Sequence, residues 1–242
     1  MNDIYLSIII PAYNESERLP PTLADINEKL KNVDYNYEIL VINDGSKDDT
    51  AGVVKKLEGQ VKNLKLIDNQ KNKGKGGVVR QGMLAANGQV RLFTDADNST
   101  SISHFEQMIP YFNSGYDVVV GSRALKGSRL DPPQPFSRRV LGKFGNLFIQ
   151  IMVLPGIWDT QCGFKAFSKE AAIKIFDLSH ISGWGFDVEA LALAHHFGYK
   201  IKEIPVRWVN DTRSRVKGSA YLQVLIETIK IRWWLWSGKY NK

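Results

Sequence analysis

The chain has 242 residues, of which 43% are hydrophobic and 24% charged, which is typical of a globular protein with one large core and excludes a disordered or fibrous chain. No apolar run of about 18 residues occurs, and the first predicted strand follows no basic leader, so we expect neither a transmembrane helix nor a signal peptide. The formal net charge is +7, and its basic residues gather in segments 123–143 and 198–242, which suits phosphate-bearing partners. The single cysteine, Cys162, precludes an intrachain disulfide and favours a reducing compartment.

The first half of the chain alternates between predicted strands and predicted helices. Apolar runs predict strands at 5–10, 37–43, 63–69, 89–95 and 116–123, with the first ending at Pro11. Apolar residues at helical spacing predict helices at 18–32, at 46–60 with Ser46 as the cap, at 74–87 after a glycine-rich entry, and at 103–115 with an interruption at Pro110. Alternation of this kind predicts right-handed βαβ crossovers and a mainly parallel central sheet flanked by helices.

The pattern changes after residue 124. A basic loop at 124–139 precedes an apolar stretch at 140–158, which is too short and too interrupted to span a bilayer. A short helix from Lys169, an apolar helix at 183–198, a strand at 200–208 and a second basic loop follow. A final helix starts near Ala220. We therefore expect one α/β domain over 1–218 and a C-terminal amphipathic helix over 219–242.

Polar residues follow four of the predicted strands. Ligands of parallel sheets bind beyond the carboxyl ends of the strands. The segments expected at that edge are 11–15, 43–46, 95–97 and 121–123. The sequence therefore predicts one ligand site built from the strand ends.

Asp95 and Asp97 are the strongest metal-ligand candidates. Two residues apart in extended backbone, they would leave the chain on the same face. Two carboxylates on one face suit Mg²⁺ or Mn²⁺, which keeps other positions for water and phosphate. The alternative is that both are turn residues after a strand, where Asp is common.

Asp44 and Lys75 have two interpretations each. Asp44 either accepts from a base N–H or only marks the Asp-Gly turn. Lys75 either meets a phosphate beside glycine N–H groups or is a solvated charge at a helix entry. The glycine spacing there is not that of a Walker motif.

Six motifs in this order resemble a family 2 glycosyltransferase of the GT-A fold: SIIIPAYNES, EILVINDGSKDDT, NKGKGGVVRQGM, DADNST, VVVGSR and DTQCGFKAF. DTQCGFK, GWGFDVEAL and EIPVRW resemble the dolichyl-phosphate or polyprenyl-phosphate β-glucosyltransferase branch. The resemblance covers residues 4 to 235.

The resemblance implies a role for each matching residue. The nucleotide sugar would be held by Pro11, Ala12, Tyr13, Glu15, Asp44, Lys75, Asp95 and Ala96, and the metal by Asp95 and Asp97. The acceptor phosphate would be held by Arg123, Arg138, Arg139, Arg213, Arg215 and Lys217. The catalytic residues would be Asp97, Arg123 and Asp159, with Asp159 beside the donor sugar. Ser99 departs from the glutamine of mannosyl relatives, which weakens a mannosyl interpretation.

The implied reaction is metal-dependent, inverting transfer of glucose from UDP-glucose to a polyprenyl or dolichyl phosphate. The acceptor phosphate is already anionic at neutral pH, because its second pKa is about 6. Positioning by arginine is therefore needed more than a strong base, which favours a sugar-orienting role for Asp159 over a general-base role. A soluble polysaccharide or protein acceptor, and a mannose or N-acetylglucosamine donor, remain alternatives.

The acceptor lipid implies contact with a membrane. The final helix offers an apolar stripe beside Lys230 and Arg232, made of Leu222, Leu225, Ile226, Ile229, Trp233 and Trp236. We expect it to dock on the cytoplasmic face of a membrane as a peripheral contact, with packing on the protein's own core as the alternative. A nucleic-acid partner is disfavoured, because aromatic residues are not interleaved with the basic segments in an RNA-binding motif.

Overall fold

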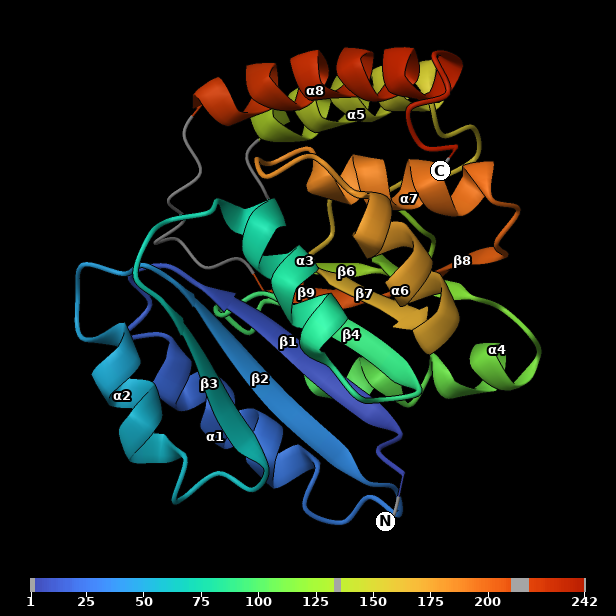
Figure 1. The fold of residues 1–242 in the computed structure, drawn as a ribbon. Helices are drawn as coiled ribbons and strands as arrows, with labels where there is room; N and C mark the ends of the chain where they lie inside the picture. Colours follow the sequence, from blue (N-terminus) through green and yellow to red (C-terminus); the bar gives the residue numbers. More distant parts are fainter. Residues whose placement is uncertain (1–2, 133–135, 210–217, 242) are drawn as a thin grey trace.

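The computed structural model describes residues 3–132, 136–209 and 218–241, with the backbone alone over 136–141 (Figure 1). Its central sheet has seven strands in the order β3-β2-β1-β4-β7-β5-β8. The strands are β1 (Leu6–Ala12), β2 (Tyr37–Asp44), β3 (Leu64–Asn69), β4 (Val90–Thr94), β5 (Val118–Ser122), β7 (Phe164–Ser168) and β8 (Ile201–Pro205). β7 runs antiparallel to both β4 and β5, and the other pairs are parallel. The predicted mainly parallel sheet is confirmed.

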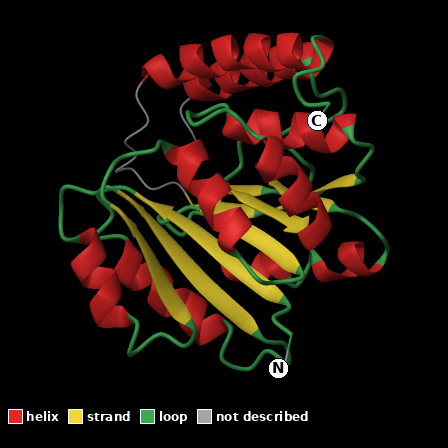
Figure 2. Ribbon diagram, in the orientation of Figure 1, coloured by secondary structure: helices red, strands yellow, loops and turns green. Residues whose placement is uncertain are grey.

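Helices cover both faces of the sheet (Figure 2). One face carries α1 (Leu19–Lys29), α2 (Thr50–Leu57), the 3₁₀ helix η1 (Ile102–Phe105) and α4 (Ile109–Asn113). The other face carries α3 (Lys75–Ala85), α6 (Lys169–Leu178) and α7 (Phe186–His196). Successive side chains of a strand point to opposite faces, so Ile8 belongs to one apolar cluster and Ile9 to the other. Burial on both faces explains why the strands are continuous apolar runs.

Four predicted boundaries were wrong. β1 continues through Pro11 to Ala12, and the missing N–H of Pro11 costs little because pairing with β4 already ends at Ile9. α2 begins at Thr50, and the Ser46 hydroxyl instead bonds the side chain of Asn43 at 2.5 Å. The helix predicted at 103–115 is split into η1 and α4, with Pro110 in the first turn of α4, where its missing N–H is tolerated.

The fourth difference lies in the basic segments. The strand predicted at 200–208 breaks at Val206 into β8 and β9 (Arg207–Val209). β9 pairs with β6 (Arg129–Asp131) in a second, two-stranded sheet. β6 and the start of α5 (Phe136–Met152) therefore lie in what the sequence indicated was a loop.

α5 and α8 (Gly218–Trp236) lie side by side as an outer layer above α7 (Figure 1). Val224 and Ile231 of α8 are buried in the main core, so the helix is packed on the domain rather than extended from it. Tyr240 follows α8, and its hydroxyl donates to Glu189 of α7 at 2.7 Å. Within the described ranges, no helix combines the length and apolarity needed to cross a membrane.

Candidate active site

The candidate site lies at the edge of the sheet where the parallel strands end. Three predicted segments leave β1, β2 and β4 there, and Arg123 follows β5 at the same edge. Asp159 comes from the segment that leads into β7, and Lys75 opens α3. The structure thus brings Asp44, Lys75, Asp95, Arg123 and Asp159 to one edge, as the strand order predicts.

Lys75 and Asp95 form an ion pair. Lys75 Nζ lies 2.7 Å from Asp95 Oδ1 and also lies over the ring of Trp184, at 5.4 Å from its centroid. Burial alone would lower the pKa of Lys75, but the charges of Asp95 and Asp187 outweigh it and raise the pKa. Lys75 is therefore a cation paired with Asp95. The interpretation of Lys75 as a purely solvated charge does not hold.

Asp97 lies in a turn after β4, so the argument from extended backbone was wrong. The turn includes Asn98 at φ 53°, and Ser99 donates its backbone N–H to Asp97 Oδ1 at 3.0 Å. Asp95 and Asp97 are still separated by only one residue, and burial and the negative charge of Asp95 both raise the pKa of Asp97. A half-buried carboxylate pair held against its own repulsion fits a divalent cation. No group of three or more His, Cys, Asp or Glu side chains forms a metal cage in the described part of the chain, so further ligands would come from phosphate and water.

Gly163 makes room for Asp95. Asp95 donates its backbone N–H to the Gly163 carbonyl at 3.2 Å. A Cβ at Gly163 would lie 1.8 Å from Asp95 Oδ2, which no real contact allows. The glycine of DTQCGFK is therefore required for the carboxylate to stand where it does.

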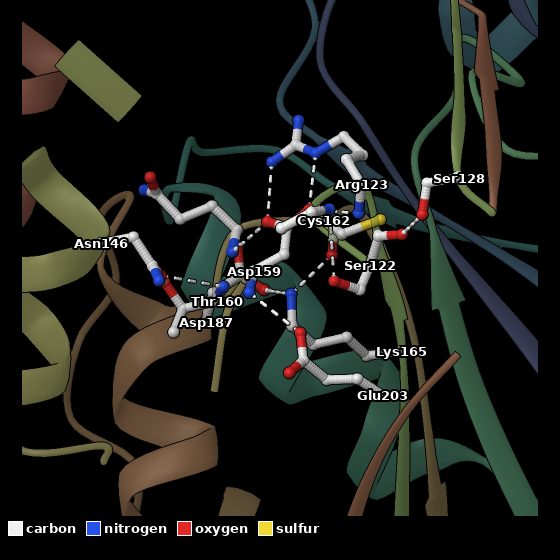
Figure 3. Close-up of polar contacts among 12 residues, drawn as sticks. Ser122, Arg123, Ser128, Asn146, Asp159, Thr160, Cys162, Lys165, Asp187 and Glu203 are labelled. Atoms are coloured by element: carbon white, nitrogen blue, oxygen red, sulfur yellow. Dashed lines mark hydrogen bonds and ion pairs between the residues drawn. The ribbon is translucent and has the colours of Figure 1, made fainter. Parts of the chain in front are cut away.

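Arg123 and Asp159 are bound to each other by three hydrogen bonds (Figure 3). Arg123 donates from Nε to Asp159 Oδ2 at 2.7 Å, from Nη2 to Oδ1 at 2.9 Å, and from its backbone N to Oδ2 at 2.8 Å. Burial would raise the pKa of Asp159, but Arg123 outweighs burial and lowers it. The guanidinium also lies over Trp208, 5.5 Å from the ring centroid. The Nη1 edge is not used by Asp159, so the pair presents that edge to a further anion.

Lys165 and Asp187 form a second, fully buried ion pair. Lys165 Nζ lies 2.7 Å from Asp187 Oδ1 and donates to the Cys162 carbonyl at 2.5 Å. Burial raises the pKa of Asp187, and the charges of Lys165 and Lys75 oppose that rise. Asp187, which belongs to α7, therefore interacts with the charges of both Lys165 and Lys75. Burial also raises the pKa of the Cys162 thiol to about 12, so Cys162 is a packed thiol and not a nucleophile.

Asp44 holds the loop that leads to Lys75. Its Oδ1 accepts from the Lys73 backbone N–H at 2.6 Å, while the next N–H, of Gly74, donates to Asn72 Oδ1 at 3.1 Å. Burial raises the pKa of Asp44, and the nearby backbone N–H groups of Lys73 and Gly74 oppose that rise. Asp44 thus has a structural task besides any contact with a base.

The glycines before α3 serve packing more than ligand approach. Gly74 has φ +80°, and a Cβ there would lie 2.4 Å from the Ser182 carbonyl oxygen. The same oxygen accepts from the Gly76 N–H at 2.9 Å. The Gly76 N–H is therefore already paired within the protein, and it is not one of the N–H groups that would be available to a phosphate.

The remaining predicted residues are placed less directly. Pro11, Ala12 and Ala96 are buried backbone of the edge, and the Ala96 carbonyl accepts from Thr22 Oγ1 at 2.8 Å. Tyr13 is exposed, while Glu15 pairs with Arg18 at 3.3 Å. Arg138 and Arg139 lie in the first turns of α5 with undescribed side chains, and Arg213, Arg215 and Lys217 lie outside the described residues.

The sequence analysis missed several residues of the site. Lys165 could have been found, because a lysine inside the buried strand FKAF requires a partner. Gly163 and Asp187 were quoted within motifs but given no task. Trp184 and Trp208, which flank Lys75 and Arg123, have no sequence signal of their own, because ring contacts depend on how distant segments meet.

Comparisons with known proteins agree with this geometry. The family model described as glycosyl transferase family 2 matches residues 7–176. A dolichyl-phosphate β-glucosyltransferase of Dictyostelium discoideum is 39% identical over 96% of this chain and 75% of its own length. The enzymes with that name from Saccharomyces cerevisiae and Homo sapiens are 35% and 34% identical, over 95% and 87% of this chain and 72% and 69% of their own lengths.

Solved structures show the same fold at low identity. Glucosyl-3-phosphoglycerate synthase from Mycobacterium tuberculosis, in complex with Mn²⁺, UDP-glucose and phosphoglyceric acid, aligns with a TM-score of 0.72 at 18% identity, over 95% of this chain and 80% of its own. Mannosyl-3-phosphoglycerate synthase from Rubrobacter xylanophilus aligns at 0.71 and 15%, over 98% and 75%. The GT-A fold is confirmed, and the family model and the sequence identities show that the chain belongs to glycosyl transferase family 2 and is a glycosyltransferase.

Proposed function

We propose that this glycosyltransferase moves glucose from UDP-glucose to a polyprenyl phosphate of the dolichyl type. The main support for this proposal is that two cationic side chains lie at one edge of the sheet, each paired with a different aspartate. Lys75 is bound to Asp95, and Arg123 is bound to Asp159. The Asp95 N–H donates to the carbonyl of Gly163, which lies in the same segment as Asp159, so the two pairs stand on adjoining segments of this edge. This arrangement suits two phosphate-bearing substrates, and the names of the relatives indicate which two.

The donor half is assigned to Asp95, Asp97 and Lys75. Asp95 and Asp97 would hold Mg²⁺ or Mn²⁺, which would supply charge stabilisation for the departing diphosphate. Mn²⁺ is present with UDP-glucose in the Mycobacterium tuberculosis glucosyl-3-phosphoglycerate synthase complex. Lys75 remains protonated and would bind the same diphosphate from the α3 side.

The acceptor half is assigned to Arg123. Its Nη1 edge is turned away from Asp159 and would bind one face of the lipid phosphate. The lowered pKa of Asp159 makes it a weak proton acceptor at neutral pH. Asp159 therefore fixes Arg123 instead of acting as general base, and the anionic phosphate attacks without one. In-line attack on an α-linked donor would give a β-linked product.

The outer helices supply a surface for the lipid-bearing membrane. Large apolar side chains of α8 are exposed, namely Leu222, Ile226, Ile229, Trp233 and Trp236, and α5 adds Phe144, Leu147 and Ile151. Trp236 is 82% exposed and Ile151 is 75% exposed. Isolated apolar side chains are normal on a protein surface, but this many on two adjacent helices indicate an interaction surface. Lys143, Lys230 and Arg232 are exposed on the same two helices and would meet anionic headgroups. We accordingly propose a peripheral location on the cytoplasmic membrane face.

A partition assay tests the proposal. Purified protein with Mn²⁺ or Mg²⁺ and a short-chain polyprenyl phosphate receives radiolabelled UDP-glucose, UDP-N-acetylglucosamine or GDP-mannose in turn. We expect label in the organic phase from UDP-glucose alone. Organic-phase label from another donor would overturn the glucose assignment. A parallel incubation replaces the lipid with 3-phosphoglycerate. Label on 3-phosphoglycerate there, with none in the organic phase of the lipid incubations, would overturn the lipid acceptor and leave the family membership intact.

Two variants separate the halves of the site. Asp97→Ala should abolish transfer and remove the metal dependence of UDP binding. Arg123→Ala should leave UDP binding unchanged and raise the KM for the lipid phosphate. Equal loss of both substrates in Arg123→Ala would contradict the division into halves.

A further inference from the structure

We propose that Glu203 of β8 is a positioning residue for the acceptor phosphate, acting through Asp159 and Arg123. The inference rests on the proposed assignment of Arg123 to the acceptor. Glu203 opens the EIPVRW motif but has been given no task, and the strand-end rule does not select it because it lies inside a strand and not after one.

Glu203 binds the backbone that carries Asp159. Its Oε2 accepts from the Trp158 N–H and its Oε1 from the Asp159 N–H, both at 2.9 Å (Figure 3). Two consecutive N–H groups therefore point at one carboxylate, and each oxygen takes one of them. Hydrogen bonds to a charged acceptor are stronger than neutral ones, so this clamp restrains both position and direction of the 158–159 peptide.

The clamp leads directly to Arg123. Asp159 accepts three hydrogen bonds from Arg123, two from the guanidinium and one from the backbone. The Gln161 N–H also donates to Asp159 Oδ1, at 3.3 Å. If the 158–159 peptide shifts, the carboxylate shifts with it, and the guanidinium loses the fork geometry that aims its Nη1 edge.

Glu203 is itself held by the sheet. In the β5–β8 ladder Glu203 is paired with Val120, and Pro205 with Ser122, the residue before Arg123. β8 therefore fixes Arg123 from two directions, through the strand that carries it and through the carboxylate that binds it. A rigid strand is the kind of element that holds a site group within the narrow tolerance that catalysis needs.

The donor half has no part in this clamp. Asp95 is anchored by Lys75 of α3 and by the carbonyl of Gly163, which follows the clamped peptide but is held next to β4 by the pairing of Phe164 with Thr94. Loss of the Glu203 carboxylate should therefore weaken acceptor binding and leave nucleotide binding unchanged. A general loss of folding would affect both.

The test uses Glu203→Gln, which keeps the shape but turns an amide NH₂ toward a backbone N–H. We expect the KM for a short-chain polyprenyl phosphate to rise about 10-fold, with the Kd for UDP and Mn²⁺ unchanged. The matched control is Glu58→Gln, since Glu58 also accepts a backbone N–H, from Leu66 at 2.8 Å, but on β3. Glu203→Asp, whose carboxylate is too short to reach both N–H groups, should give the same direction of change if Glu203→Gln does not fold.

A double-variant cycle distinguishes positioning from mere support of the fold. In an Arg123→Ala background, Glu203→Gln should raise the acceptor KM no further, because its effect passes through Arg123. If Arg123→Ala alone leaves the acceptor KM unchanged, the proposed acceptor assignment fails. If Arg123→Ala raises it but Glu203→Gln matches Glu58→Gln, or the two effects multiply independently, the inference about Glu203 is overturned.

Discussion

The ammonium of Lys75 lies 2.7 Å from Oδ1 of Asp95, so the protein already supplies a cation to one of the carboxylates assigned to the divalent metal. The same Nζ lies near the rings of Trp184 and Phe186, at 5.4 and 5.9 Å from their centroids. A second cation at Asp95 must therefore share this carboxylate with Lys75 or displace it. A divalent cation held by Asp95 would therefore compete with Lys75, and a bound diphosphate would offer Lys75 another anion.

Lys75→Met should consequently tighten the binding of Mn²⁺ alone and weaken the binding of UDP. Removing a like charge next to a cation site changes its affinity by about 10-fold in a partly exposed setting. Electron paramagnetic resonance of free Mn²⁺ measures the first effect and calorimetry with UDP the second. Lys73→Met is the control, because Lys73 Nζ bonds Gln81 Oε1 instead. Weaker binding of Mn²⁺ alone to Lys75→Met would contradict the competition.

Gly163→Ala should damage the donor half of the site selectively. The new Cβ would meet Asp95 Oδ2 at 1.8 Å, so the carboxylate must leave its position. We expect at least about 100-fold lower kcat/KM for the nucleotide sugar, because small misplacements of a positioned group cost rates of that order. Steady-state kinetics checks this, with Gly59→Ala as control since a Cβ there meets nothing within 4 Å. Wild-type kinetics in Gly163→Ala would refute the steric role of this glycine.

Asp159→Asn should destabilise the protein at neutral pH and cease to do so in acid. Arg123 holds the pKa of Asp159 below the ordinary aspartate value of 3.8, so the folded state favours the carboxylate. Its stabilisation is present above that value and is lost as the pH falls through the lower, folded-state pKa. Thermal unfolding should show Asp159→Asn melting several degrees below wild type at pH 7, with the two curves converging below pH 3.8. If the difference in melting temperature grew toward acid pH, the pKa of Asp159 would be raised in the folded state and not lowered.

Polar substitutions on the outer helices should release the protein from vesicles. Burial of one large apolar side chain contributes about 1.5–3 kcal/mol, so Phe144→Ser with Trp233→Ser should reduce vesicle binding at least about 100-fold. Sedimentation with phosphatidylserine-containing vesicles measures it. Ile173→Ser is the control, because Ile173 is 44% exposed but lies on α6. Equal release by Ile173→Ser, or none by the double variant, would remove the assigned docking surface.

Lys165→Met should destabilise the fold by about 3–5 kcal/mol, since it leaves Asp187 buried without its closest partner. Lys165→Met with Asp187→Leu should recover most of that loss, because two apolar groups leave no charge in the core. Denaturant unfolding of the three proteins gives the free energies. If the second substitution does not recover stability, the Asp187 charge is needed for more than its pair with Lys165. Its interaction with Lys75 would then also stabilise the fold.

The sequence was informative wherever the signal was local. Apolar runs located six of the seven strands of the central sheet and missed β7, whose short run FKAFS is interrupted by Lys165. The strand-end rule located Asp44, Asp95 and Arg123, because the carboxyl ends of parallel strands meet at one edge whatever the details of packing. The GT-A fold and the family followed from motifs in a fixed order and were confirmed by the comparisons.

The contacts themselves were beyond the sequence. Lys75 and Asp95, and Arg123 and Asp159, were each proposed for ligands, and nothing in their spacing indicated that they bind one another in the free protein. The turn at Asp97 was missed because D-x-D is compatible with both extended and turned backbone. Glu203 was missed because its hydrogen-bond donors are backbone N–H groups, which every residue except proline has.

The reversed strand β7 has a consequence for how the enzyme is made. β7 lies between β4 and β5 and pairs with both, although it follows them in the sequence. A nascent chain that ends before Phe164 can therefore assemble the four strands β3, β2, β1 and β4. One edge of β4 stays unpaired, and β5 has no neighbouring strand. Insertion of β7 closes that gap and at the same moment brings Gly163 to Asp95 and Asp159 to Arg123. One strand therefore brings contact partners to both Asp95 and Arg123, and a fragment that lacks β7 leaves the edge of β4 unpaired.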